Sequence, residues 1–209
     1  MNGFFYDFIL APLERTAFAP LRQRLIFGAK SSVPRALGQV VEIGMGTGAN
    51  LRFYPPGTMV TGVEPDDSMR DRAVLRAERE RSRGVVIRVV KGEAEALPFP
   101  DLSFDTAVAT LVFCSLRDPE SAVQEIGRVL KPGGYFLAFE HVRHNWKWLG
   151  RLLDWFTPLW RFFADGCHLN RDPESLFREA RFEIVQQKRL WLGFGKMWVL
   201  RKPEKASRK

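Results

Sequence analysis

Three acidic residues and a run of alternating glycines are the features of this sequence that most clearly indicate chemistry. The stretch QVVEIGMGTGANL (residues 39–51) ends an apolar run at Glu42 and then places glycine at positions 44, 46 and 48. Glycine lets the backbone approach a ligand closely and permits positive φ. The spacing is not the G-x-G-x-x-G that seats a pyrophosphate on a helix N-terminus, and a carboxylate beside the loop would repel a phosphate. The pattern therefore favours a cationic ligand.

Two further acids follow the next two apolar runs. Glu64 comes directly after residues 59–63, and Glu93 follows residues 85–90. The carboxyl ends of parallel strands meet at one edge of a sheet, where open α/β folds bind ligands, and a carboxylate at the end of the second strand can accept hydrogen bonds from both hydroxyls of a ribose. We therefore expect Glu42, Glu64 and Glu93 to gather around one ligand.

The elements that must position these acids alternate between strand and helix. Residues 68–80 have a helical pattern with Asp66 or Asp67 as the cap, and residues 119–130 follow the N-cap candidate Asp118. Such alternation predicts an α/β fold: a doubly wound, Rossmann-like sheet, mostly parallel with an antiparallel C-terminal strand, and helices on both faces. The apolar runs that indicate strands are residues 40–43, 59–63, 85–90, 106–113, 135–139, 182–190 and 195–200.

Composition narrows the class of protein. The chain has 209 residues and a formal net charge of +8, and residues 70–91 hold eight basic residues against three acidic ones. We interpret that excess as a solvated helix face and expect no nucleic-acid partner, because no recognition motif accompanies it. Cys114 and Cys167 have no C-x-x-C spacing, so we expect no zinc site and no disulfide framework. Two unpaired cysteines fit a reducing cytoplasm, no apolar run is long enough to span a membrane, and no signal peptide is evident. We expect a cytoplasmic protein and leave peripheral contact with a membrane open.

Four segments resemble the successive motifs of class I S-adenosylmethionine-dependent methyltransferases. They are E-x-G-x-G-x-G, GVEPDDSM, GEAEALPFPDLSFD and EIGRVLKPGG, in order between about residues 40 and 140. The resemblance implies that S-adenosylmethionine is the cofactor and that Glu64 holds its ribose, with Pro65 and Met69 beside the adenine and Glu93 accepting from the adenine amino group. The remaining residues that the resemblance implies at the cofactor are Glu42, Gly44, Met45, Gly46, Ala94 and Thr110.

The second half is similar to the methyltransferase-like alkyl thiol S-methyltransferases of animals, which are associated with internal membranes and lipid droplets. The similarity lies in LV-F-CS after the fourth strand, EHV (residues 140–142) and DGC-L-R (residues 165–171). The N-terminal segment holds no convincing hydrophobic anchor, so we do not expect membrane residence to transfer. Quinone-biosynthesis and phospholipid methyltransferases share the same core and remain alternatives for the acceptor.

Candidate residues for the acceptor side come from these motifs. His141 has an ordinary pKa near 6.5 and is the candidate base for an acceptor that must lose a proton. Tyr6 matches a position where related enzymes fold an N-terminal aromatic over the cofactor. Substrate or lid candidates are Cys114, Asp165 and His168, the last two in a D-G-C-H turn with Cys167.

The segment HNWKWLGRLLDWFTPLWRFF (residues 144–163) is apolar on two adjacent helical faces and carries interspersed basic residues. Three interpretations compete: a helix packed between lid and core, the wall of an apolar pocket, or a surface that dips into a membrane interface. We expect one domain, with residues 1–38 as a helical cover, 40–141 as the cofactor-binding core, and 142–209 as the Trp-rich cover and final strands.

The sequence thus predicts a methyltransferase whose acceptor is a small, apolar molecule, with a thiol as first choice. The alternatives are a quinone or phospholipid methyltransferase at a membrane surface, and a non-catalytic scaffold that keeps the cofactor fold. The intact acids argue against the scaffold. The oligomeric state is left open.

Overall fold

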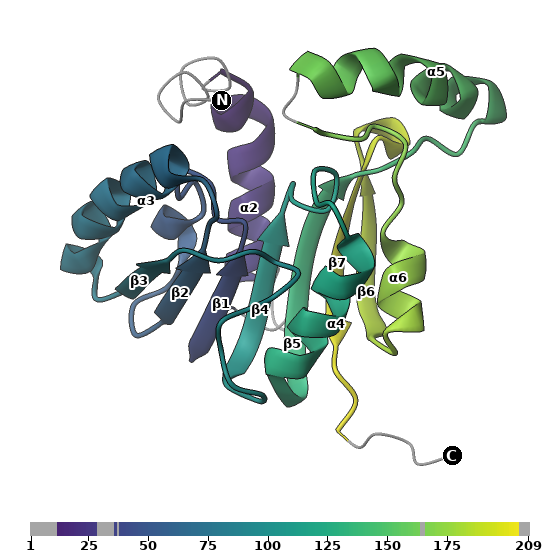
Figure 1. The fold of residues 1–209 in the computed structure, drawn as a ribbon. Coiled ribbons are helices and arrows are strands. Elements are labelled where there is room, and N and C mark those ends of the chain that lie inside the picture. Colours follow the sequence, from purple (N-terminus) through teal and green to yellow (C-terminus); the bar gives the residue numbers. More distant parts are fainter. Residues whose placement is uncertain (1–11, 29–35, 37, 164–165, 205–209) are drawn as a thin grey trace.

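One seven-stranded sheet organises the computed structural model, which describes residues 12–28, 36, 38–163 and 166–204. Its strand order is β3-β2-β1-β4-β5-β7-β6 (Figure 1). The first five strands are parallel neighbours, while β7 lies antiparallel between β5 and β6. The predicted doubly wound sheet with an antiparallel C-terminal strand is confirmed. The strands are β1 (Gln39–Ile43), β2 (Met59–Val63), β3 (Val86–Val90), β4 (Phe104–Thr110), β5 (Leu130–His141), β6 (Glu183–Leu190) and β7 (Gly195–Arg201).

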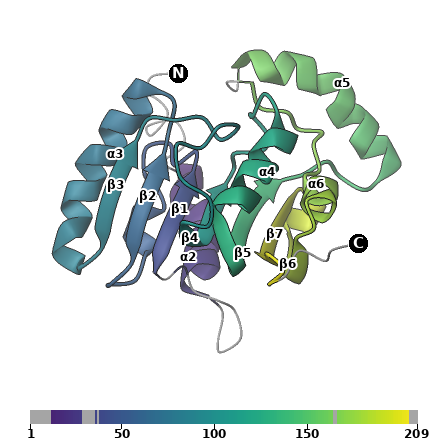
Figure 2. The same ribbon diagram turned by 60° about the horizontal axis from the view of Figure 1, so that its bottom comes forward.

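Helices cover both faces of this sheet (Figures 1 and 2). Helices α2 (Ala19–Phe27) and α3 (Asp67–Glu80) pack on one face, and α4 (Pro119–Val129) and α6 (Glu174–Glu179) on the other. Asp66, one of two predicted caps, accepts a hydrogen bond from the Met69 backbone N–H at 2.8 Å. Asp118 caps α4 in the same way. Both caps fix where a helix begins, and therefore where the preceding loop meets the edge of the sheet.

Strand β4 ends three residues earlier than the apolar run predicts. Leu111 has a φ of +60°, which turns the chain away from the sheet. The backbone N–H groups of Val112 and Phe113 donate to the carboxylate of Glu140, at 2.8 and 3.2 Å, instead of to a neighbouring strand. A buried acid at the end of β5 thus replaces sheet pairing, and the apolar residues after Thr110 pack as a turn.

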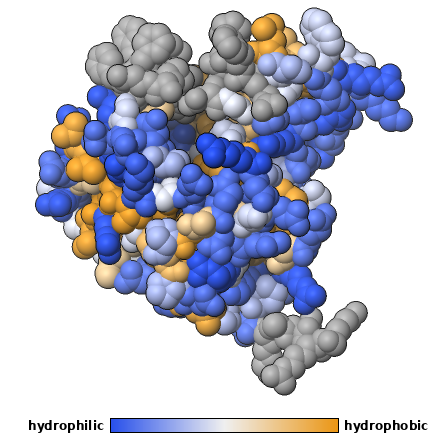
Figure 3. All heavy atoms as spheres, in the orientation of Figure 1, coloured by the Kyte–Doolittle hydropathy of each residue, from blue (hydrophilic) through white to orange (hydrophobic). Residues whose placement is uncertain are grey.

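Strand β3 is apolar but not buried on both sides. It forms one edge of the sheet, and the Val86 side chain is 63% exposed. Apolar side chains gather over α3 and β3 in Figure 3. The central strands are buried on both faces, whereas this edge strand stays partly exposed.

Helix α5 (Lys147–Phe163) lies beyond the carboxyl edge of the sheet (Figure 1). Trp148 is 64% exposed and Trp155 is 78% exposed. Of the three interpretations of this segment, burial between lid and core is wrong for the face that carries these residues. Within the described part of the chain, no helix is both long and apolar enough to cross a bilayer.

Candidate active site

Two adjoining pockets open at the carboxyl edge of the sheet. One, of about 350 Å³, lies between the loop after β1 and the N-terminal helices, and Met45 and Thr110 are on its wall. The other, of about 530 Å³, lies beside the ends of β2 and β3. The pockets share Gly44, Gly46 and Leu111, so they form two parts of one site. Predicted cofactor residues that line the second pocket are Glu64, Pro65, Met69, Glu93 and Ala94.

The loop after β1 presents bare backbone to both pockets. Gly46 has a φ of +56°, and a Cβ placed there would meet no atom within 4 Å, so this residue faces open space. A Cβ on Gly44 would lie 2.9 Å from the Val112 side chain, so this glycine lets β1 and the turn after β4 approach each other. The two glycines thus serve different purposes: one leaves room for a ligand and the other permits packing.

The Met45 side chain packs against Gly62 of β2, which has no side chain of its own. The methionine side chain is buried, and a Cβ on Gly62 of β2 would lie 2.1 Å from the Met45 sulfur. The thioether therefore occupies the space that a side chain at position 62 would fill. The loop keeps its backbone exposed while its one large side chain points into the core.

Glu64 ties the end of β2 to the glycine loop. Its carboxylate accepts hydrogen bonds from the backbone N–H of Gly46 at 2.8 Å and of Asp66 at 3.1 Å. Burial raises the pKa of Glu64 above its ordinary range, although the two backbone hydrogen bonds oppose that shift. The two hydrogen bonds hold the carboxylate in one orientation on the pocket wall. A carboxylate fixed in this way can accept hydrogen bonds from ribose hydroxyls.

Glu42 lines neither pocket. It is fully buried beneath the loop, where it accepts hydrogen bonds from Asn50 at 2.9 Å and from the Tyr54 hydroxyl at 2.8 Å. Burial raises the pKa of Glu42 to about 7, although the hydrogen bonds from Tyr54 and Asn50 lower it. Glu42 therefore supports the loop from below through Asn50 and Tyr54, and its role toward the cofactor stays a prediction.

Arg22 of α2 is a residue of the first pocket that the sequence analysis missed. It is buried, and its guanidinium donates to Asn50 at 3.0 Å and to the Thr110 hydroxyl, while also pairing with Glu14. A cation here extends the Asn50–Glu42 network to the pocket wall. No local spacing signals it, because its partners Asn50 and Thr110 lie 28 and 88 positions along the chain.

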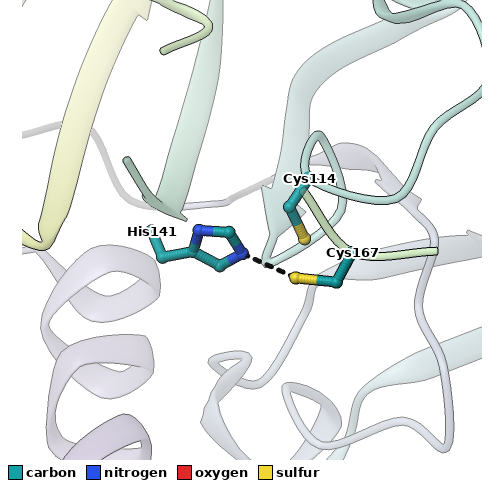
Figure 4. Close-up of side chains that lie close together, drawn as sticks. All are labelled: Cys114, His141 and Cys167. Carbon is teal, nitrogen blue, oxygen red and sulfur yellow. Dashed lines mark hydrogen bonds between the residues drawn. The ribbon is translucent and has the colours of Figure 1, made fainter. Parts of the chain in front are cut away.

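Cys114, His141 and Cys167 converge from three separate segments (Figure 4). The His141 Nε2 atom lies 3.0 Å from the Cys167 sulfur. The hydrogen bond from Cys114, followed by that of His141, lowers the pKa of Cys167 to about 4, whereas the hydrogen bond to Cys167 and burial raise the pKa of Cys114. Burial lowers the pKa of His141, but the hydrogen bond and the charge of Cys167 raise it by more, so the pKa of His141 lies above its ordinary value. The proposed base thus has its ring turned toward a cysteine.

The turn that carries Cys167 is fastened to the segment after β4. The backbone N–H of His168 donates to the Cys114 carbonyl at 2.8 Å, and the Arg171 guanidinium donates to the carbonyls of Phe113 and Leu116. The predicted lid residue His168 therefore lies against the segment after β4. Tyr6 and Asp165 fall outside the described residues.

The arrangement fits an adenosyl cofactor. Gly46 leaves open space over the loop, Glu64 stands fixed on the wall, and Glu93 lies exposed in the same pocket. The two carboxylates can accept hydrogen bonds from a nucleoside, and the open backbone at Gly46 lets that nucleoside lie close to the loop.

Comparisons with known proteins agree with this geometry. The family model described as a methyltransferase domain matches residues 41–138. Thiol S-methyltransferase TMT1B of Rattus norvegicus is 32% identical over 190 residues, covering 87% of this chain and 77% of the relative. Phosphatidylethanolamine N-methyltransferase of Cereibacter sphaeroides is 32% identical over 151 residues, covering 72% of each chain.

A solved structure shares the fold over nearly the full length. The SAM-dependent methyltransferase from Thermotoga maritima has a TM-score of 0.66 and 28% identity, covering 96% of this chain and 95% of that one. The relatives, the pockets and the edge acids agree with one another. This chain belongs to the class I S-adenosylmethionine-dependent methyltransferases of the type 11 methyltransferase domain family.

Proposed function

We propose that this methyltransferase methylates the sulfur of a small, apolar thiol. The observation that carries the proposal is the convergence of the three motifs similar to thiol S-methyltransferases. Cys114 follows β4, His141 ends β5 and Cys167 follows α5. The two cysteine sulfurs and a ring nitrogen of His141 nevertheless all lie within 4.8 Å of one another. A relative that is named as a thiol S-methyltransferase matches 87% of this chain, which supports a thiol as the acceptor.

The chain's own residues have mainly a positioning task. S-adenosylmethionine supplies a methyl group already activated on a sulfonium sulfur. Glu64 and Glu93 orient the nucleoside, and the bare backbone at Gly46 lets it lie close to the sheet. An acceptor that arrives as a thiolate needs no general base, so alignment and exclusion of water account for the catalysis.

The test is a screen with matched acceptors. Thiophenol, phenol, aniline and phosphatidylethanolamine vesicles are each incubated with the protein and S-adenosylmethionine, and S-adenosylhomocysteine is quantified. We expect turnover with thiophenol at least about tenfold above phenol, because methylation of phenol requires loss of a less acidic proton. Turnover confined to the phospholipid or the amine contradicts the thiol assignment.

A second candidate, methylation of a lipid or quinone at a membrane surface, is favoured by helix α5. Its exposed face carries Trp148, Trp155 and Leu159, the last 56% exposed, with Lys147 and Arg151 on the same helix. An exposed apolar face with basic neighbours is typical of a helix that lies in a membrane interface. The similarity to a phosphatidylethanolamine N-methyltransferase supports this alternative.

Flotation with anionic liposomes tests the membrane contact. If α5 enters the interface, Trp148→Ser with Trp155→Ser reduces the floated fraction by about tenfold or more, because two large apolar side chains are lost. Leu192→Ser is the matched control, since Leu192 is 97% exposed and lies outside α5. A wild-type protein that does not float removes this candidate.

A further inference from the structure

We propose that Cys114, His141 and Cys167 form a binding site for a thiophilic divalent metal ion, Zn²⁺ in the first place, with one coordination position left for a thiol. The sequence led us to expect no zinc site, because the two cysteines lie 53 positions apart with no local ligand spacing. The fold removes that separation. The metal site stands on the geometry of the cluster, and the role of its fourth position rests on the proposed thiol acceptor.

The distances suit a tetrahedral ion. The three ligand atoms lie within 4.8 Å of one another, with His141 Nε2 and Cys167 Sγ 3.0 Å apart. Zinc–ligand bonds of about 2.0 to 2.3 Å place neighbouring ligand atoms about 3.6 to 3.8 Å apart. Small rotations of the three side chains therefore bring the cluster to the required spacing. Figure 4 shows the side chains pointing toward one another.

The backbone that carries the ligands is held in place without a metal. His168 N–H and the Arg171 guanidinium fasten the turn around Cys167 to carbonyls of the segment after β4. Glu140 fixes the other side by accepting from Val112 and Phe113, and His141 is the last residue of β5. A site whose ligands come from three anchored segments loses little conformational entropy on binding an ion.

The ligand types select the metal. Two sulfurs and one imidazole suit Zn²⁺, whereas oxygen ligands suit Mg²⁺ and Ca²⁺. Three protein ligands with a fourth position for water or substrate is the arrangement of catalytic zinc sites. An acceptor thiol that takes this position forms a metal–sulfur bond and releases its proton to solvent, which yields the thiolate that methylation needs.

A second observation lies directly beside the cluster. Glu140 is fully buried, and its Oε2 atom has no hydrogen-bond partner among the described residues. Its charge interacts with Cys114, His141 and Cys167. Carboxylates commonly stabilise the surroundings of metal-bound histidine, and an ion of positive charge in the cluster would compensate this buried acid.

Cobalt spectroscopy of the full chain tests the site. The chelator-treated protein is titrated with Co²⁺, and the near-ultraviolet sulfur-to-cobalt charge-transfer band and the visible bands are followed. We expect one equivalent of tetrahedral Co²⁺, displaced by Zn²⁺. Cys114→Ser, Cys167→Ser and His141→Ala each weaken Co²⁺ binding more than about 100-fold, since a direct ligand contributes more than its neighbours do.

The matched control is His144→Gln. His144 is a histidine outside the cluster, and its Nε2 atom lies 3.0 Å from the Leu192 carbonyl. This variant keeps the Co²⁺ affinity of the wild type. A folded wild type without the charge-transfer band overturns the metal site, and so does a band of full strength in the Cys114→Ser, Cys167→Ser double variant.

The role of the fourth position is tested with the same preparation. Thiophenol added to the cobalt-loaded protein shifts the visible bands, whereas phenol leaves them unchanged. Thiophenol methylation by metal-free protein that shows no cobalt band overturns the site and leaves the proposed function intact. A cobalt site that accepts thiophenol, in an enzyme that never methylates it, supports the site and contradicts the proposed function.

Discussion

Glu64 and Glu42 show how similar residues at one edge of a sheet take different tasks. Both are acids at or near the ends of neighbouring strands, and burial raises the pKa of both. Glu64 reaches the pocket wall and is bound by backbone N–H groups, whereas Glu42 is enclosed by Asn50 and Tyr54. The first is therefore expected to act on the ligand and the second on the stability of the loop.

Replacement of the pocket acid tests its role. Glu64→Ala should raise the Kd for S-adenosylmethionine by about 10- to 100-fold, since hydrogen bonds to a charged group contribute about 1.5 to 3 kcal/mol. Titration calorimetry measures the change. Glu78→Ala, which removes an exposed acid of α3, is the control. Equal affinities for the wild type and Glu64→Ala would refute the ribose assignment.

Replacement of the buried acid should change the pH dependence of stability. The folded pKa of Glu42, about 7, exceeds its ordinary value of 4.5, so the folded chain binds more protons between these limits. This contribution to stability is complete below about pH 4.5 and is lost as pH rises through 7, by at most about 3 kcal/mol. Urea denaturation from pH 5 to 8 should therefore show a steeper decline for the wild type than for Glu42→Gln. Parallel declines would contradict the burial of Glu42.

At the scale of elements, packing between the loop after β1 and strand β2 decides the form of the glycine loop. Met45 occupies the space above Gly62, so the size of one residue limits the size of the other. The family resemblance implies only that Met45 lies at the cofactor, as part of the glycine loop. The structure shows that its side chain matters too, through β2.

A double substitution tests this pairing. Gly62→Ala should lower the free energy of unfolding by about 1 to 3 kcal/mol, because the added methyl overlaps the Met45 sulfur. In a Met45→Ala background the same change should cost less than about 1 kcal/mol, since the space is then free. Thermal or urea unfolding measures all four proteins. An identical cost in both backgrounds would exclude direct packing.

The sequence predicted the elements well where its signals are local. Caps such as Asp66 and Asp118 lie beside the helices they begin, and five of the seven apolar runs match their strands within one residue at each end. Strand β5 begins five residues before its apolar run, because the chain passes from α4 into the strand at Leu130. The end of β4 could not be predicted in this way. Its turn depends on Glu140, which is 28 positions from Val112 and meets it only in the folded chain.

At the scale of the whole molecule, the cofactor side of the site could be predicted from the sequence and the arrangement of the Cys114, His141 and Cys167 cluster could not. The cofactor side follows strand order, because each acid lies near the end of its strand or shortly after it, and nine of the ten predicted residues line a pocket. The proposed acceptor side is assembled from three distant segments, so the contact of His141 with Cys167 could be found only in the folded chain. Arg22 was missed for the same reason.

The most direct test of the account is a structure of the chain bound to S-adenosylhomocysteine. We predict that the Glu64 carboxylate lies within hydrogen-bond distance of both ribose hydroxyls and that Glu93 faces the adenine amino group. The homocysteine sulfur should lie between the Gly44–Gly46 backbone and the turn at Leu111, which both pockets share. A nucleoside bound elsewhere, or with Glu64 turned away from its ribose, would contradict the account.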